Sequence, residues 1–124
     1  MRGTLLAVGI GGAVGTGARI ALSLAALHLL PDAAYIATLA ANVLGAALIG
    51  YLATRTLRPI ATAFLMTGFC GGFTTFSLFS FEVLVLLETG AVAALAYGTV
   101  SLVLWVGATA AGYRLGMGRN SATR

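Results

Sequence analysis

Residues 68–82 read GFCGGFTTFSLFSFE, and this stretch decides how the chain folds. It lies within a long apolar run from about residue 60 to residue 87, which is typical of a helix that crosses a membrane. The centre of the run is a poor helix, because the glycines Gly71-Gly72 and the β-branched residues Thr74-Thr75 all lower helix propensity. We therefore predict a membrane-spanning helix that is broken near residues 71–75.

The composition of the whole chain agrees with a membrane protein. Of its 124 residues, 60% are hydrophobic and only 8% are charged, whereas a soluble domain is about 25% charged. A helical span needs about 20 residues. Lipid offers no hydrogen-bond partners, so the backbone groups of each span must be paired within the protein, as they are in a helix. We predict an all-α membrane protein with one transmembrane domain over residues 1–124, made of four spans at about 4–29, 35–54, 60–87 and 91–113.

The arginines predict the orientation of this domain. The two ends and the loop between spans 2 and 3 carry Arg2, Arg55, Arg58, Arg114, Arg119 and Arg124. The other two loops, at Pro31-Asp32 and around Glu88, carry none. The positive-inside rule then places both termini in the cytoplasm. No basic stripe with interleaved aromatics exists, so we do not expect nucleic-acid binding.

Polar side chains within the spans are candidates for function, because burying them in lipid is costly. Asn42 lies deep in span 2, and Thr38 precedes it by one helical turn. A break in span 3 would also free backbone carbonyls, which need a cation, water or another helix as partner. An interhelical hydrogen bond would equally explain Asn42.

Beyond the predicted break, Phe76 and Phe79 share one helical face, and Ser77 and Ser80 form a neighbouring pair before Glu82. The edge of an aromatic ring carries positive partial charge. Ring edges beside hydroxyl and amide donors can hold a small anion weakly enough to release it, as conduction requires. Packing in the core or against lipid is the alternative role for these rings.

Span 4 carries a further row of hydroxyl groups. Tyr97, Ser101 and Thr109 lie roughly along one face, and Trp105 interrupts the row at the intervening position.

The pattern resembles the Fluc family of fluoride channels, also called CrcB proteins. The resemblance covers all four spans. It rests on Gly11-Gly12-x-x-Gly15-x-x-x-Arg19, on Ala41-Asn42-x-x-Gly45, and on the long motif from Gly68 to Glu82.

The resemblance implies a multi-pass protein of the bacterial inner membrane that exports fluoride passively through an antiparallel dimer. It implies a structural sodium ion at the dimer centre, held by the carbonyls of Gly71 and Thr74. Within the fluoride pathway it implies roles for Asn42, Phe76, Phe79, Ser77, Ser80, Thr38 and Tyr97. Arg19 and Glu82 would lie in the vestibules.

The arginine bias fits less well with a homodimer, because members that form homodimers insert in both orientations. We therefore hypothesise that this chain inserts one way and pairs with an oppositely oriented paralogue, with a homodimer as the alternative.

Two other functions compete with a channel. A transporter of the small multidrug resistance class has a similar size, but it uses a carboxylate in span 1, where this chain has only Arg19. A non-conducting subunit of a membrane complex would not need Asn42 beside Phe76 and Phe79. We expect no enzyme, because the sequence has no nucleophile–base pair and no cluster of metal-binding side chains.

Overall fold

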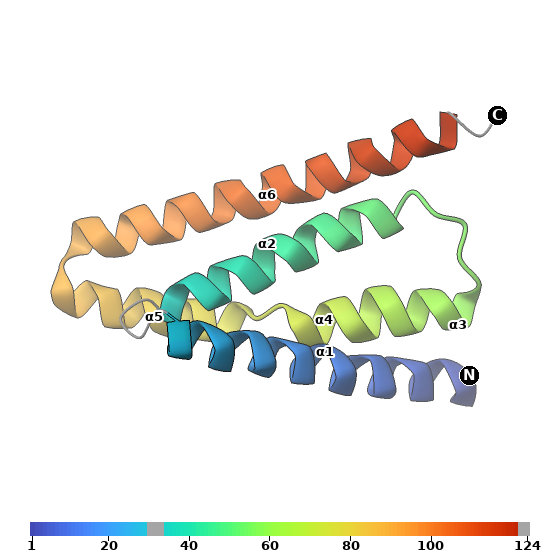
Figure 1. Cartoon of the computed structure of the whole chain (residues 1–124), viewed down its shortest axis with the longest axis horizontal. Helices are drawn as coiled ribbons and strands as arrows, with labels where there is room; N and C mark the ends of the chain where they lie inside the picture. Colours follow the sequence, from blue (N-terminus) through green and yellow to red (C-terminus); the bar gives the residue numbers. More distant parts are fainter. Residues whose placement is uncertain (30–33, 122–124) are drawn as a thin grey trace.

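The computed structural model describes residues 1–29 and 34–121, and within these ranges every regular element is a helix (Figure 1). The helices run antiparallel, and both termini lie at the same end of the molecule. The expected turn at Pro31-Asp32 lies outside the described residues, as does Arg124. The elements are α1 (Arg2–Leu29), α2 (Ala34–Leu52), α3 (Pro59–Thr62), η1 (Ala63–Cys70), α4 (Gly71–Phe73), α5 (Phe76–Thr89) and α6 (Ala91–Ser121).

Among the described residues, four helical segments are long and apolar enough to cross a membrane: Arg2–Leu29, Tyr35–Leu52, Pro59–Thr89 and Ala91–Arg119. The third is the composite of α3, η1, α4 and α5. Helix α6 continues past Tyr113, where we expected the span to end, to Ser121. The length and apolar character of these segments make the chain a multi-pass membrane protein.

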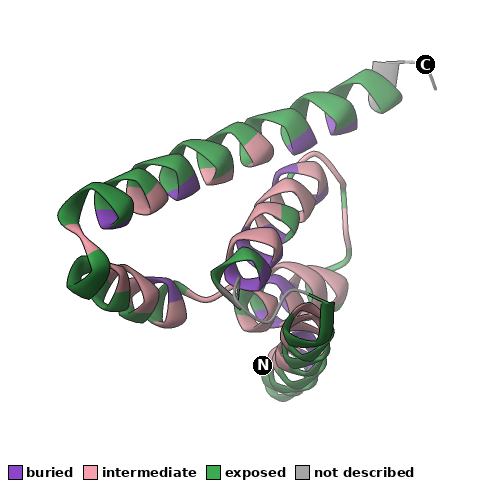
Figure 2. Cartoon of the chain, turned by 60° about the vertical axis from the view of Figure 1, so that its left-hand side comes forward, coloured by how far each residue is buried: buried purple, intermediate pink, exposed green. Residues whose placement is uncertain are grey.

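Burial supports the same conclusion. Buried positions follow the lines where helices touch, and the outward faces are exposed (Figure 2). Those faces carry large apolar side chains such as Leu5, Val92 and Val106, which are 69%, 83% and 72% exposed. Apolar surface on this scale is unfavourable in water but not in contact with lipid tails.

Glycines bring the backbones of two helix pairs into direct contact. A Cβ at Gly11 or Gly15 would overlap a backbone carbonyl of η1, and one at Gly72 would overlap the backbone of α1. In the second pair, α2 against α6, a Cβ at Gly50 or Gly112 would meet the backbone of the facing helix. Close packing through small residues is how helices associate in lipid, where no hydrophobic force drives them together.

The break in span 3 is present, but the threonines form it rather than the glycines. Gly71 and Gly72 stay in helical conformation, while Thr74 (φ −84°, ψ 157°) and Thr75 (φ −149°, ψ 120°) are extended. Gly72 is needed for contact with α1. Before the break, the backbone is also widened into a π-helix over Ala63–Cys70. The sequence did not indicate this segment.

Candidate functional site

The side chain of Asn42 holds the broken backbone in place. Its Oδ1 accepts a hydrogen bond from Thr75 N (2.7 Å), and its Nδ2 donates one to Thr75 O (2.9 Å). The amide thus pairs with Thr75 as a neighbouring strand would. Asn42 is 5% exposed, so these bonds are made away from solvent. One hydrogen of Nδ2 remains, because a carboxamide nitrogen carries two.

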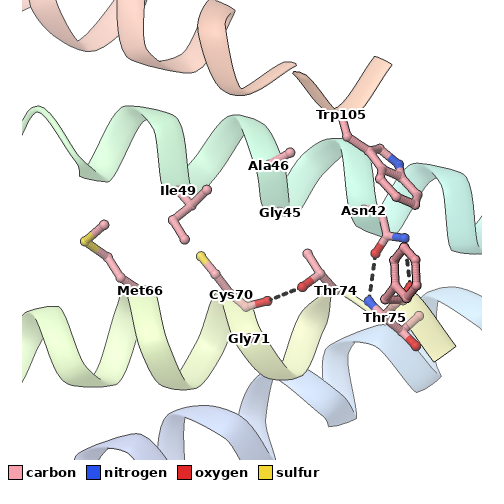
Figure 3. Close-up of a pocket in the computed structure, with 11 residues that line it drawn as sticks. Asn42, Gly45, Ala46, Ile49, Met66, Cys70, Gly71, Thr74, Thr75 and Trp105 are labelled. Atoms are coloured by element: carbon pink, nitrogen blue, oxygen red, sulfur yellow. Dashed lines mark hydrogen bonds between the residues drawn. The ribbon is translucent and has the colours of Figure 1, made fainter. Parts of the chain in front are cut away.

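The hydroxyl groups of the two threonines complete the local structure. Thr74 Oγ1 turns back to donate to Cys70 O (2.9 Å), as Figure 3 shows. Thr75 Oγ1 accepts from Leu78 N (3.2 Å) and so caps the start of α5. Threonine is a favoured residue at such a cap. The two adjacent threonines therefore end one helix and begin the next.

The break leaves several carbonyls without their usual helical partners. Gly72 O instead accepts from Thr16 Oγ1 (3.3 Å) and Arg19 Nε (3.3 Å) on α1. Within residues 1–29 and 34–121, no hydrogen bond reaches the carbonyl oxygens of Gly71, Phe73 and Thr74. Of these three residues, Gly71 and Thr74 line the pocket beside the break. Unpaired carbonyls at membrane depth need a polar partner.

That pocket has a volume of about 310 Å³ and lies between α2, η1, the break and α6. Figure 3 shows its lining side chains, with Asn42 and Trp105 at one end and Met66 at the other. Of the predicted site residues, it brings together Asn42, Gly71, Thr74 and Phe76. Its wall is mostly apolar, and its polar groups concentrate around the break.

An aromatic cluster continues from this pocket along α5 and α6. The ring of Phe79 packs against Phe76 (5.6 Å between centroids), Tyr97 (5.6 Å) and Trp105 (4.7 Å, near perpendicular). The predicted pair of phenylalanines is unequal, since Phe79 is 6% exposed and Phe76 is 67% exposed. Phe79 is the centre of the cluster, and Phe76 presents its ring to the outside of this chain.

A carboxylate lies at the far side of the aromatic cluster. Glu82 accepts a hydrogen bond from Thr38 Oγ1 (2.5 Å) through one oxygen and from Tyr97 OH (2.6 Å) through the other. The structure thus joins three predicted residues from α2, α5 and α6. Both distances are short, as is usual for a hydroxyl group that donates to a carboxyl oxygen. None of the three lines the pocket at the break.

The remaining predicted residues lie apart from the pocket. Ser80 Oγ donates to Phe76 O (2.9 Å) within its own helix, and Ser77 Oγ lies 3.3 Å from Thr75 Oγ1. Arg19 is half-buried against Gly72, as described above.

Trp105 is a residue of the site that we did not predict from the sequence. We treated it as an interruption of the hydroxyl row of span 4, but it lines the pocket and contacts Phe79. Its spacing from Ser101, one turn earlier on α6, was the available signal.

Comparison with known proteins places the chain in a family. Residues 6–113 match the CrcB-like protein family, described as Camphor Resistance (CrcB). A protein of Paracoccus denitrificans is 40% identical over 95% of this chain and 98% of its own length. One from Rhodospirillum centenum is 43% identical over 90% and 93% of the two chains, and one from Escherichia fergusonii is 46% identical over 69% and 71%.

All three relatives bear the name fluoride-specific ion channel FluC. The match covers nearly all of the four spans, including the break and Asn42. The chain therefore belongs to the CrcB family, also called Fluc, which is a family of ion channels and not of enzymes.

Proposed function

We propose that this chain is a subunit of a passive, fluoride-selective channel that lets fluoride leave the cytoplasm across the inner membrane. The observation that carries the proposal is the backbone break held by Asn42 beside Phe76 and Phe79. The relatives named as fluoride channels support the choice of ion.

The chemistry of the pathway follows from the donors available. Fluoride is small and strongly hydrated, so a pathway must replace its water with close hydrogen-bond donors. The second Nδ2 hydrogen of Asn42 and the edges of Phe76 and Phe79 supply partial positive charge without a cation. We assign Ser77, Ser80, Thr38 and Tyr97 to the flanks of the route. We assign Arg19 and Glu82 to its vestibules.

A sodium ion at the centre of a dimer would satisfy the break. Gly71 and Thr74 each leave a carbonyl oxygen without a hydrogen bond from any described residue, and both residues line the pocket. Carbonyl oxygen is a hard ligand that suits hard cations. Two chains would supply four such oxygens, and the ion would add positive field near the fluoride route. The donor set thus fits the ion that the family resemblance implies.

We further propose that the channel is an antiparallel dimer. Phe76 is largely exposed on this chain, and the pocket at the break is open to one side. A second copy in the opposite orientation would cover both. The arginine bias favours an oppositely oriented paralogue as this partner, with both termini of the present chain in the cytoplasm.

The function is tested by ion release from liposomes that contain the purified chain. We expect rapid fluoride release, read with a fluoride electrode, and no release from chloride-loaded vesicles. Vesicles in which Phe79 is replaced by Ala serve as the matched variant, with release lowered by at least about tenfold. Release of both anions at equal rates would contradict the proposed selectivity.

If the chain alone releases no fluoride, the same assay is repeated after co-expression with a paralogue of opposite arginine bias. Restored release would support the heterodimer, and continued absence of release with a properly folded pair would refute the channel proposal.

A further inference from the structure

Two buried side-chain groups on α6 have no hydrogen-bond partner among the described residues, the hydroxyl of Ser101 and the indole of Trp105. Of the two residues, only Trp105 lines the pocket beside the break. The indole nitrogen Nε1 of Trp105 is enclosed, and within the described part of the chain nothing accepts its hydrogen. Leaving such a group unpaired costs about 1–3 kcal/mol. Buried donors of this kind therefore usually have a partner, and an unpaired one needs an explanation.

The position of this donor suggests its partner. Trp105 lines the same pocket of about 310 Å³ as Asn42 and Phe76, and its ring lies 4.7 Å from that of Phe79. Figure 3 shows the indole beside Asn42, at the end of the pocket nearest the break. The indole of Trp105, the side chain of Asn42 and the two phenylalanine rings are therefore neighbours.

The chemistry of indole separates it from the other residues in its row. Tyr97, Ser101 and Thr109 carry hydroxyl groups, which both donate and accept hydrogen bonds. An indole N–H only donates. It can therefore pair with an anion or a water oxygen, but it offers no lone pair to a cation or to the hydrogen of a water molecule.

We propose that the N–H of Trp105 binds the permeating fluoride directly and forms a donor-only station between Asn42 and the hydroxyl groups of α6. This inference rests on the proposed function, because it assigns a further residue to the same route. Trp105 thus contributes to the selectivity for fluoride, although from the sequence it only interrupted the row of hydroxyl groups in span 4.

The chain offers a direct probe, because Trp105 is its only tryptophan. In detergent-solubilised protein we expect added sodium fluoride to shift the tryptophan emission to longer wavelength and to saturate. Sodium chloride at equal concentration should leave the emission unchanged. An emission spectrum that does not respond to fluoride would overturn the inference.

Flux through variants gives the second readout. Trp105→Phe keeps an aromatic ring against Phe79 but removes the N–H, and we expect fluoride release to fall by about tenfold or more. Trp105→His restores a ring N–H and should recover part of the rate. Leu104→Phe, at the neighbouring exposed position, should conduct like the unmodified chain.

The outcomes distinguish the two proposals. Trp105→Phe must first be shown to fold, by its elution as a single species. If it then conducts at the unmodified rate, Trp105 serves only through the contact of its ring with Phe79, and the inference fails. If the unmodified chain conducts no fluoride but its emission responds to fluoride and not chloride, the anion site stands and the channel proposal fails for this chain alone.

Discussion

At the scale of single residues, Asn42 has two candidate roles that the sequence could not separate. An interhelical hydrogen bond and a place in the ion route were alternatives, and the structure shows the first in full: two bonds to Thr75. The second is still open to the amide, because one Nδ2 hydrogen is unused. Glu82 is held in a comparable way, with Thr38 and Tyr97 each donating to one oxygen.

Replacing Asn42 by Leu tests its role in holding the break. The variant removes both partners of Thr75, whose N–H and carbonyl would then be unpaired at membrane depth. We expect the free energy of unfolding to fall by about 2–6 kcal/mol, the cost of two unsatisfied backbone groups. Unfolding in a detergent titration, followed by circular dichroism, measures it.

The matched control is Leu44→Val, a change at an exposed position two residues along the same helix. It should alter stability by less than about 1 kcal/mol. Equal stabilities for the two variants would show that Thr75 is satisfied without Asn42.

At the scale of elements, the adjacent residues Gly71 and Gly72 have different roles. A Cβ on Gly72 would overlap the backbone of Gly12 on α1, whereas a Cβ on Gly71 would meet no atom within 4 Å among the described residues outside its own helical turn. The composite helix of span 3 can therefore pack against α1 only because residue 72 is glycine. Gly71 faces the pocket, where we place the second subunit and the sodium ion.

The pair Gly72→Ala and Gly71→Ala tests this division. Gly72→Ala forces α1 and α4 apart, so we expect it to lower the thermal midpoint clearly or prevent folding. Gly71→Ala should leave the fold of the single chain intact. Its thermal midpoint, measured by loss of the monodisperse peak in size exclusion after heating, should be close to that of the unmodified chain when no sodium is present.

Sodium extends the same comparison. Added sodium should raise the midpoint of the unmodified protein, since a ligand of the native state stabilises it, and should raise that of Gly71→Ala less. Equal loss of stability in both alanine variants would count against the separate roles of the two glycines.

At the scale of the whole molecule, topology and charge agree. Both termini lie at one end of the bundle (Figure 1), together with the loop between α2 and α3 that carries Arg55 and Arg58. At the opposite end, the last turn of α5 carries Glu88, and neither it nor the connection to α6 carries an arginine. The positive-inside rule applied to this distribution predicts a single orientation in the membrane.

Reporter fusions at the C-terminus measure that orientation. A cytoplasmic reporter should be active and a periplasmic reporter inactive, in keeping with the arginine distribution. Arginines introduced beside Glu88 by Thr89→Arg and Ala91→Arg, both at exposed positions, should weaken the bias, whereas the same two positions changed to Ser should not. Equal activity of both reporters in the unmodified chain would refute the single orientation and favour a homodimer.

Composition and local sequence patterns were enough to predict the class of the protein, its helical segments and the position of the break. Those features depend on local properties, namely hydropathy over about 20 residues and the low helix propensity around Thr74-Thr75. The sequence also identified Asn42 as a candidate, because a polar amide within an apolar membrane span is costly whatever the fold.

The contacts that these residues make could be seen only in the folded chain. Asn42 reaches Thr75 across 33 positions of sequence, and Thr38 reaches Glu82 across 44. The same packing leaves the carbonyls of Gly71 and Thr74 without a donor among the described residues and encloses the N–H of Trp105. Such pairings follow from how the helices dock, which is set by glycines that let backbones touch. A periodic pattern along one helix carries no information about the register of its neighbour.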